Sequence, residues 1–162
     1  MKTQQRHRTT KLTAFLLTLS LLLLGCRDHR VYHHFLPVKT TCWTVTDTLR
    51  FTPDAMKSDG LYTMKAGVRV NDNYPYRDLW LVVEQRATAP HREPARRDTV
   101  HIILADSDGK WLTQGVTLHE TEEVVAASRL AKDCTYEFLV YHIMKDQNLI
   151  GVSDVGLSLS LN

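Results

Sequence analysis

Side chains alternate between apolar and polar with a period of two along much of this chain, and no other feature restricts its fold as strongly. The alternation is clearest in LYTMKAGVRV, residues 61–70, whose apolar set is Tyr62, Met64, Ala66, Val68 and Val70. Successive side chains of a β-strand point to opposite faces of a sheet, so this pattern predicts a strand buried on one face. The same criteria predict strands at 43–51, 79–84, 99–105, 110–118, 136–144 and 151–162.

Turn-forming residues separate the predicted strands, at Pro53-Asp54, Ser58-Asp59-Gly60, Asn71-Asp72-Asn73, Asp106-Ser107-Asp108-Gly109 and Asp146-Gln147-Asn148. Seven or eight short strands with no long helical pattern predict an all-β fold, an antiparallel β-sandwich of immunoglobulin-like or jelly-roll-like architecture. The carboxylates at 106–109 suggest a calcium loop, but residue 117 is a threonine where an EF-hand has glutamate. We therefore predict a tight turn there, with Gly109 at positive φ.

Two segments do not follow the alternation. HETEEVVAASRLAK, residues 119–132, has Val124, Ala127 and Leu130 at helical spacing, so it is either a short helix or a strand followed by a loop. We favour a strand for its first half. Residues 86–98 are rich in proline and arginine, which predicts a solvated loop, with contact to lipid head groups or to an acidic partner as the alternative.

The first 25 residues have the organisation of a bacterial lipoprotein signal peptide. A basic region is followed by an apolar stretch from Leu12 to Leu24, which is shorter than the roughly 20 residues that span a bilayer. The stretch ends in Leu23-Leu24-Gly25-Cys26, the pattern of a lipobox. We predict cleavage before Cys26 and acylation of Cys26, for example with palmitate, which anchors the chain to a membrane. Residues 26–41 are then a lipidated tether, and 42–162 form the β-sandwich domain.

The charge balance argues against nucleic acid as a partner. Cleavage removes four of the 20 Lys and Arg and none of the 18 Asp and Glu, so the formal net charge falls from +2 to −2. The basic character of the full chain therefore belongs to the export signal.

Two cysteines remain after lipidation of Cys26. Cys42 and Cys134 lie outside the reducing cytosol in an exported protein, so they are candidates for a disulfide. Such a bond would close a loop of roughly 90 residues, although sequence alone does not show that the two Cα atoms approach.

The sequence contains no recognisable catalytic or metal-binding motif. It has no nucleophile elbow, no phosphate-binding glycine loop and no HExxH pair. His29, His33 and His34 lie close together, but they fall in the predicted tether, where no fold would orient them as ligands. We therefore expect a protein that is not an enzyme and that uses no metal, no cofactor and no small-molecule substrate.

The aromatic residues Tyr74, Tyr76 and Trp80 surround a turn and a strand entrance in VNDNYPYRDLWLVVE, residues 70–84. In an extended chain, Trp80 would point to the same face as the two tyrosines, whereas Leu79, Leu81 and Val83 would point to the other face. Burial of one aromatic ring stabilises a fold by roughly 2–3 kcal/mol, so core packing alone explains them. The alternative is a surface that recognises a partner or a ligand.

Several motifs occur here in the order found in the GldH-type gliding motility lipoproteins of Bacteroidetes, a family that the chain resembles. They are the lipobox, Arg69, Tyr74-Pro75-Tyr76, Asp78-Leu79-Trp80, Asp108-Gly109-Lys110-Trp111, Met144 and the run from Gly151 to Gly156. Segments 86–97 and 119–133 depart from the family's pattern.

The resemblance implies an outer-membrane lipoprotein that supports the gliding machinery and the type IX secretion apparatus through protein–protein contacts. An alternative function is glycan binding at the cell surface, with Tyr74, Tyr76, Trp80 or Trp111 as an aromatic platform. Surface export of lipoproteins in this phylum looks to depend on acidic residues after the acylated cysteine. Arg27-Asp28-His29-Arg30 is net basic, so we predict the periplasmic face of the outer membrane.

Overall fold

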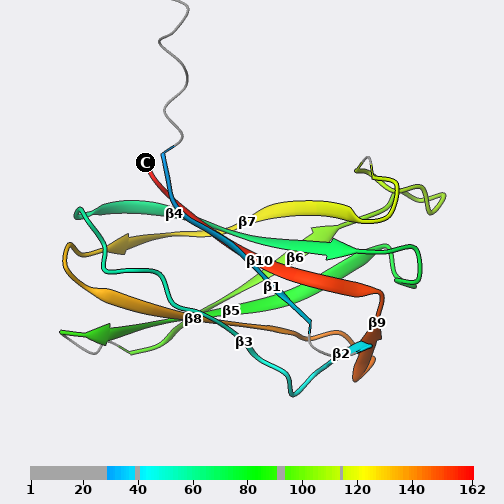
Figure 1. The fold of residues 1–162 in the computed structure, drawn as a ribbon, viewed down its shortest axis with the longest axis horizontal. Coiled ribbons are helices and arrows are strands. Elements are labelled where there is room, and N and C mark those ends of the chain that lie inside the picture. Colours follow the sequence, from blue (N-terminus) through cyan, green and yellow to red (C-terminus); the bar gives the residue numbers. More distant parts are fainter. Residues whose placement is uncertain (1–28, 39–40, 91–93, 114) are drawn as a thin grey trace, which may run out of the picture.

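The computed structural model describes residues 29–38, 41–90, 94–113 and 115–162, and these residues form two antiparallel sheets packed face to face (Figure 1). The first sheet has the order β1 (Arg30–Pro37), β10 (Val152–Leu161), β4 (Gly60–Val70), β7 (His119–Leu130). The second has the order β3 (Leu49–Phe51), β8 (Thr135–His142), β5 (Asp78–Ala89), β6 (Arg96–Ile103). β2 (Cys42–Thr44) and β9 (Asn148–Ile150) form a separate two-stranded sheet. The prediction of an all-β antiparallel sandwich is confirmed, and the described residues form ten strands, more than the seven or eight that the sequence predicts.

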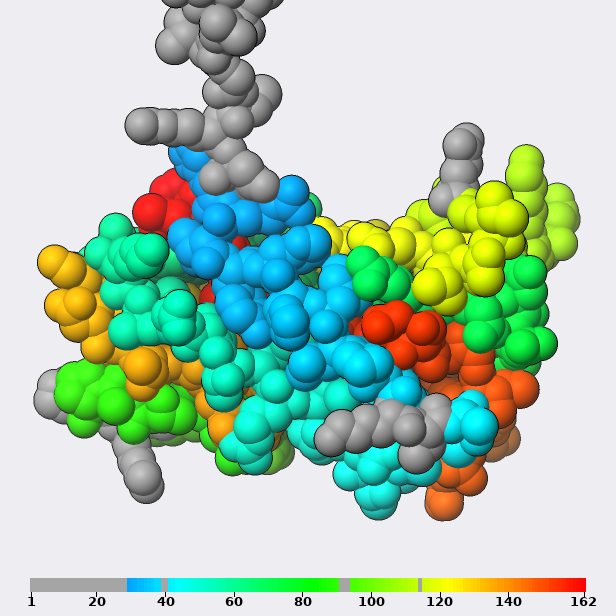
Figure 2. Space-filling view, in the orientation of Figure 1, coloured from blue at the N-terminus to red at the C-terminus, as the bar shows by residue number. Residues whose placement is uncertain are grey.

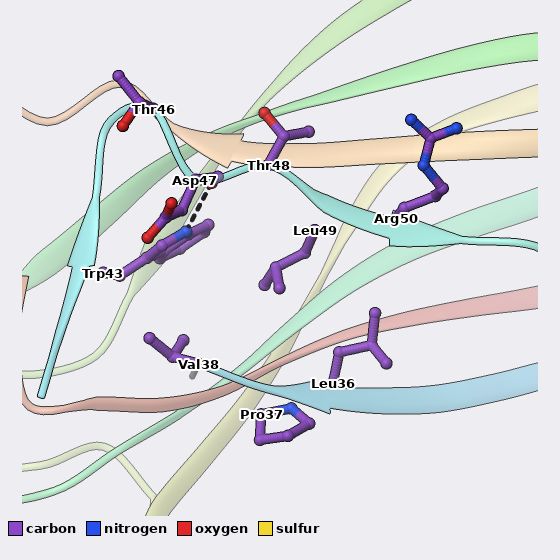
Figure 3. A pocket seen from close by; sticks show the side chains of 9 residues that line it. All are labelled: Leu36, Pro37, Val38, Trp43, Thr46, Asp47, Thr48, Leu49 and Arg50. Atoms are coloured by element: carbon purple, nitrogen blue, oxygen red, sulfur yellow. Dashed lines mark hydrogen bonds between the residues drawn. The ribbon is translucent and has the colours of Figure 1, made fainter. Parts of the chain in front are cut away.

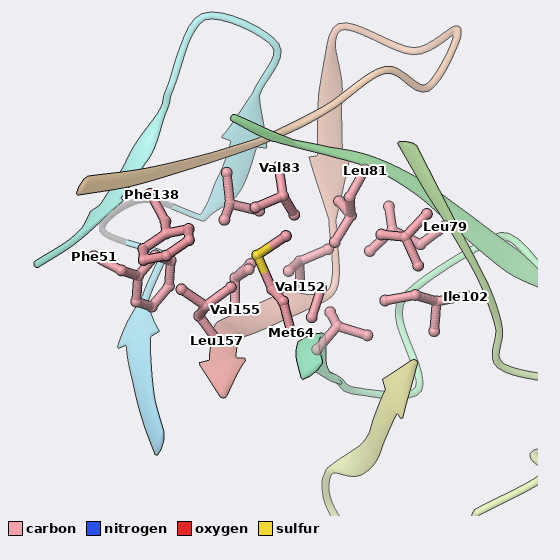
Figure 4. Packing of buried hydrophobic residues seen from close by; sticks show 14 of the residues in the cluster. Phe51, Met64, Leu79, Leu81, Val83, Ile102, Phe138, Val152, Val155 and Leu157 are labelled. Carbon is pink, nitrogen blue, oxygen red and sulfur yellow. The ribbon is translucent and has the colours of Figure 1, made fainter. Parts of the chain in front are cut away.

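The core lies between the two large sheets, and the period-two alternation determines which side chains enter it. In β4, the five apolar residues predicted to share a face are all buried: Tyr62, Met64, Ala66, Val68 and Val70. The second sheet contributes Leu79, Leu81 and Val83 from β5, which pack with residues such as Met64, Val155 and Phe138 (Figure 4). Each such side chain contributes roughly 1.5–3 kcal/mol when it is fully removed from water.

The predicted tether is wrong for Arg30–Pro37, because these residues form β1 and pair with β10 along its length. The ring of Phe35 lies against Gly67 and Gly156, which are neighbours on β4 and β10. The guanidinium of Arg69 lies 4.1 Å from the centre of the same ring. The missing side chains of the two glycines therefore make room for β1 on the sheet. Residues 1–25, the predicted signal peptide, and Cys26 lie outside the described residues.

The segment 119–132 contains a strand rather than a helix, since β7 pairs with β4 from His119 to Leu130 and ends there. The register shifts where Met64 pairs with Ala126 and the next residue, Lys65, pairs with Val124. Val125 is thus an extra residue in the strand, a β-bulge. The bulge changes the parity of the apolar side chains halfway along β7, which is why no continuous alternation is visible in the sequence.

Other strand boundaries also differ from the sequence-based expectation. Segment 43–51 contains two short strands, β2 and β3, separated by a turn. The described residues of segment 110–118 form no strand, and they make one isolated bridge, between Ala105 and Trp111. β5 extends to Ala89 and β6 begins at Arg96, so the predicted loop 86–98 is shorter than expected.

The tight turn at 106–109 is confirmed. Gly109 has φ of 80°, a region that side chains disfavour. The Asp106 carboxylate accepts hydrogen bonds from the backbone N–H groups of Asp108 and Lys110, each at 2.9 Å. The carboxylate therefore stabilises the turn itself.

Candidate interaction surface

The outer face of the second sheet carries apolar and aromatic side chains, of which Trp80 and Ile103 are exposed while Val82 is buried beside them. Directly paired residues of antiparallel strands share a face, and Trp80 pairs with His101 while Val82 pairs with Thr99 and Tyr141. Ile103 pairs with Asp78 at the end of the same row. We call this surface the Trp80 face; it comprises Trp80, Val82, Thr99, His101, Ile103 and Tyr141.

Trp80 is held in a fixed orientation although its side chain is 40% exposed. Its ring stacks on the imidazole of His101, with 4.0 Å between the ring centres and 8° between the planes. His101 Nε2 in turn lies 2.6 Å from a carboxylate oxygen of Asp78. Ile103 is 47% exposed on the same face. The face therefore presents a pre-ordered aromatic side chain to solvent.

A row of alternating charges crosses the same sheet beside the Trp80 face. The row comprises Arg97 of β6, Glu84 and Arg86 of β5, Glu137 of β8 and Arg50 of β3. Glu84 is only 3% exposed, and its two oxygens accept hydrogen bonds from Arg97 and Arg86, each at 2.6 Å. The bond from Arg97, and then that from Arg86, lowers the pKa of the Glu84 carboxyl against the opposing effect of burial.

The arginine side chains of this row remain partly open to solvent, with exposed fractions of 67% for Arg97 and 61% for Arg50. Each is paired with a carboxylate on one side and meets water on the other. The surface next to the Trp80 face is therefore basic, because the arginines are exposed while the Glu84 carboxylate is buried beneath them. We call this surface the basic rim.

The predicted aromatic group does not form one surface. Tyr74 is 4% exposed, and its hydroxyl donates to the carbonyl of Asp78 at 2.8 Å. Burial, followed by the nearby Asp78 carboxylate, raises the pKa of Tyr74. Tyr74 therefore packs in the core and does not lie on an open surface.

Tyr76 is intermediate between a core residue and a surface residue. It is half-buried, with its ring centre 5.8 Å from that of Tyr74, and its hydroxyl donates to the Asp146 carboxylate. That hydrogen bond raises the pKa of Tyr76. Trp111 lies elsewhere, stacked at 4.3 Å on His119. Of the aromatic residues considered for glycan binding, Trp80 is therefore the one that the structure presents on an open sheet face.

A cavity of about 590 Å³ lies at the end of β1 and against the β2–β3 connection (Figure 3). Its lining residues are Leu36, Pro37, Val38, Trp43, Thr46, Asp47, Thr48, Leu49 and Arg50. Trp43 is fully buried beside it and donates from Nε1 to the carbonyl of Asp47 at 2.9 Å. Sequence reasoning missed this cavity, because it exists only once β1 is part of the sandwich.

Groups that could hold a metal are absent from the described part of the chain, where His, Cys, Asp and Glu do not gather in threes. His33, one of the clustered histidines, bonds instead to Glu122 at 3.0 Å. Within the same described ranges, no helix is long and apolar enough to cross a bilayer. Cys42 lies in β2 and Cys134 precedes β8, and the structure joins neither of them in a disulfide.

Comparisons with known proteins agree with the order of motifs in the chain. Residues 30–159 match the model of the family described as GldH lipoprotein. The chain is 22% identical over 156 residues to the gliding motility lipoprotein GldH of Flavobacterium johnsoniae, covering 92% of this chain and 96% of that protein. Among solved structures, it is similar to the structure of Eiger TNF from S. frugiperda, with a TM-score of 0.32 and 12% identity over 80% of this chain and 92% of that one. A similarity at that level carries no information on function.

Proposed function

The chain belongs to the GldH lipoprotein family, and on that basis we propose that it is a non-catalytic envelope protein that supports gliding motility and type IX secretion. It acts through contacts of its Trp80 face with another envelope protein. The lipid is attached at Cys26, and the protein is held on the periplasmic face of the outer membrane. The family's connection with gliding motility supports the setting, and the geometry of the second sheet supports the contact surface.

The exposed but immobilised Trp80 is the observation that carries the proposal. A tryptophan whose orientation is already fixed loses little conformational entropy on binding, and such residues dominate the energy of many protein interfaces. Stacking on His101, together with the bond from His101 to Asp78, provides this fixation. Contiguous exposed apolar patches favour interaction sites, and Trp80 and Ile103 are exposed on the same sheet face.

The chemistry of the surroundings defines the partner. The Trp80 face is apolar at its centre, and the row of arginines along one side makes that rim basic. We therefore expect the partner to present an apolar patch bordered by Asp or Glu side chains, because complementary rim charges favour one docking orientation. The glycan-binding alternative is less well supported, because Tyr74 is buried and His101 covers one face of the Trp80 ring.

Crosslinking in the native envelope tests this function. The wild-type chain, Trp80→Ala and Leu61→Ala would be expressed at equal levels, crosslinked, solubilised and purified with their partners. Leu61 is a matched control, since its side chain is 41% exposed on the other sheet. We expect the wild type and Leu61→Ala to recover the same envelope protein and Trp80→Ala to lose most of it. Equal recovery by all three chains would contradict the proposed surface.

A further inference from the structure

The loop that precedes β7 exposes apolar side chains that the Trp80 face does not use. Leu112 is 57% exposed, Val116 is 98% exposed, and Leu118 is also exposed. We call these three residues the apolar loop. Apolar side chains exposed together in one segment favour contact with a partner or a membrane.

The base of the apolar loop is well fixed. Trp111 stacks on His119, the first residue of β7, with 14° between the ring planes. Trp111 also bridges to Ala105, and the backbone N–H of Leu112 donates to the carbonyl of Leu104 at 2.9 Å. His119 is itself buried and bonded to Asp72 at 3.1 Å. The apolar side chains are therefore presented from an ordered support.

The apolar loop and the start of β1 lie on the same side of the sandwich. Figure 1 shows the connection before β7 rising above the first sheet, on the side from which β1 starts. In the space-filling view, which has the same orientation, both regions lie along the upper edge of the outline (Figure 2). The Trp80 face belongs to the other sheet and therefore points the opposite way.

The distance from the lipid to the fold is short. The chain is already fixed at His29, whose carbonyl accepts a hydrogen bond from the N–H of Leu161 at 3.1 Å. Only two residues, Arg27 and Asp28, lie between Cys26 and His29, so three Cα–Cα steps join them. A chain spans at most about 3.6 Å per residue, so His29 lies within about 11 Å of the lipidated residue. The ten residues of β10 are about 33 Å long, so the domain is much longer than its connection to the membrane.

From these observations we infer that the apolar loop contacts the lipid bilayer and serves as a second attachment point beside the acyl chains. This inference rests on lipid attachment at Cys26, which is part of the proposed function. The short connection brings the side of the first sheet to the membrane, and the apolar loop projects from that side. Leu112, Val116 and Leu118 enter the interfacial region of the lipid, where apolar side chains are stabilised. The Trp80 face then points away from the membrane, towards the partner.

Fluorescence quenching on vesicles tests this orientation. The mature lipidated chain would be reconstituted in phosphatidylethanolamine and phosphatidylglycerol vesicles that contain a lipid with a nitroxide near its head group. Val116→Trp places a reporter on the apolar loop, and Ile103→Trp places one on the Trp80 face. Both sites are exposed, so a larger side chain needs no repacking. The three native tryptophans give the same background in both variants.

We expect the nitroxide lipid to quench the added signal of Val116→Trp at least twofold more than that of Ile103→Trp. Flotation with the vesicles is measured in parallel. Floating protein with an unquenched Val116→Trp, or with equal quenching at both sites, would overturn the orientation while leaving the lipid anchor intact. Failure to float would overturn the attachment at Cys26 itself, and the inference with it.

Discussion

The ring of Phe35 occupies the space where a side chain on Gly156 would lie. A Cβ on Gly156 would come within 2.6 Å of two carbons of that ring, and a Cβ on Gly67 would meet it at 2.8 Å. Phe35 and Gly156 are direct partners in the pairing of β1 with β10. This contact explains how β1 is held on the first sheet, although its sequence shows little alternation. An aromatic ring that lies over a cross-strand glycine pair buries glycine backbone that would otherwise be exposed to solvent.

Gly156→Ala should therefore destabilise the fold through a clash with Phe35. We expect a loss of about 1–3 kcal/mol in the free energy of unfolding, measured with urea, because the added methyl group forces the ring to move. In a Phe35→Ala background the same substitution should cost much less, which makes this a double-mutant cycle. An equal cost in both backgrounds would show that Phe35 does not fill the space over Gly156.

Gly151→Ala should cost more than Gly109→Ala, although both glycines have a φ near +80°. A Cβ on Gly109 meets nothing within 4 Å, so Gly109→Ala measures the backbone strain alone, about 1–2 kcal/mol. A Cβ on Gly151 would lie 2.3 Å from the backbone nitrogen of Tyr74, which cannot rotate away as a side chain can. Urea unfolding should show an additional loss of about 1–3 kcal/mol for Gly151→Ala; equal losses would contradict this packing.

The stability of the fold should decrease between pH 7.5 and pH 5 because of His142. Burial lowers the pKa of His142 from its ordinary value of 6.5, an effect larger than the opposing bond to the Trp43 carbonyl. The His142 imidazole is therefore protonated near pH 6.5 in the unfolded chain, but only at lower pH in the folded chain. Stability is complete above pH 6.5 and falls below it by at most about 1.4 kcal/mol per pH unit.

The variant His142→Gln should flatten this pH dependence when the free energy of unfolding is measured at intervals from pH 7.5 to pH 5. Glu84 does not interfere in this window, since its pKa is lowered from an ordinary value of 4.5 and its contribution is lost only at more acidic pH. An unchanged slope in His142→Gln would show that another group controls the acid sensitivity.

Reducing agent should leave the urea midpoint of the oxidised, purified protein unchanged, because the structure does not join Cys42 to Cys134. A disulfide across a loop of this length would stabilise the fold by about 4–5 kcal/mol in the chain-entropy model. A large drop in the midpoint on reduction would therefore reveal the bond. Cys42→Ser/Cys134→Ser is the control, because it should respond to the reductant no differently from the wild type.

The sequence best predicts those parts of the fold in which neighbouring residues determine whether a side chain is buried or a turn forms. Residues 61–70 alternate strictly, and the five apolar side chains are buried as predicted. The turn at Asp106–Gly109 was also predictable, because its carboxylate bonds within the turn and its glycine supplies the positive φ. Both features depend on residues close together in the sequence.

Features that depend on distant residues were not predictable in the same way. The sequence of β1 does not predict a strand, because its support comes from Gly67 and Gly156, far along the chain. The bulge at Val125 shifts the alternation in β7, so its apolar spacing resembled that of a helix. Tyr74 and Trp80 are an even number of residues apart, so a continuous strand would place them on the same face. Tyr74 is buried and Trp80 is exposed, because β5 begins only at Asp78 and Tyr74 lies before it.

Complementation in a strain that lacks its own copy of this gene tests the central claim most directly. Wild type, Trp80→Ala and the exposure-matched Leu61→Ala would be compared for spreading motility and protein secretion at equal envelope levels. Our account predicts that Trp80→Ala is abundant, membrane-bound and folded but restores little motility or secretion, whereas Leu61→Ala restores both. Full restoration by Trp80→Ala would contradict the claim that this protein acts through contacts of its Trp80 face.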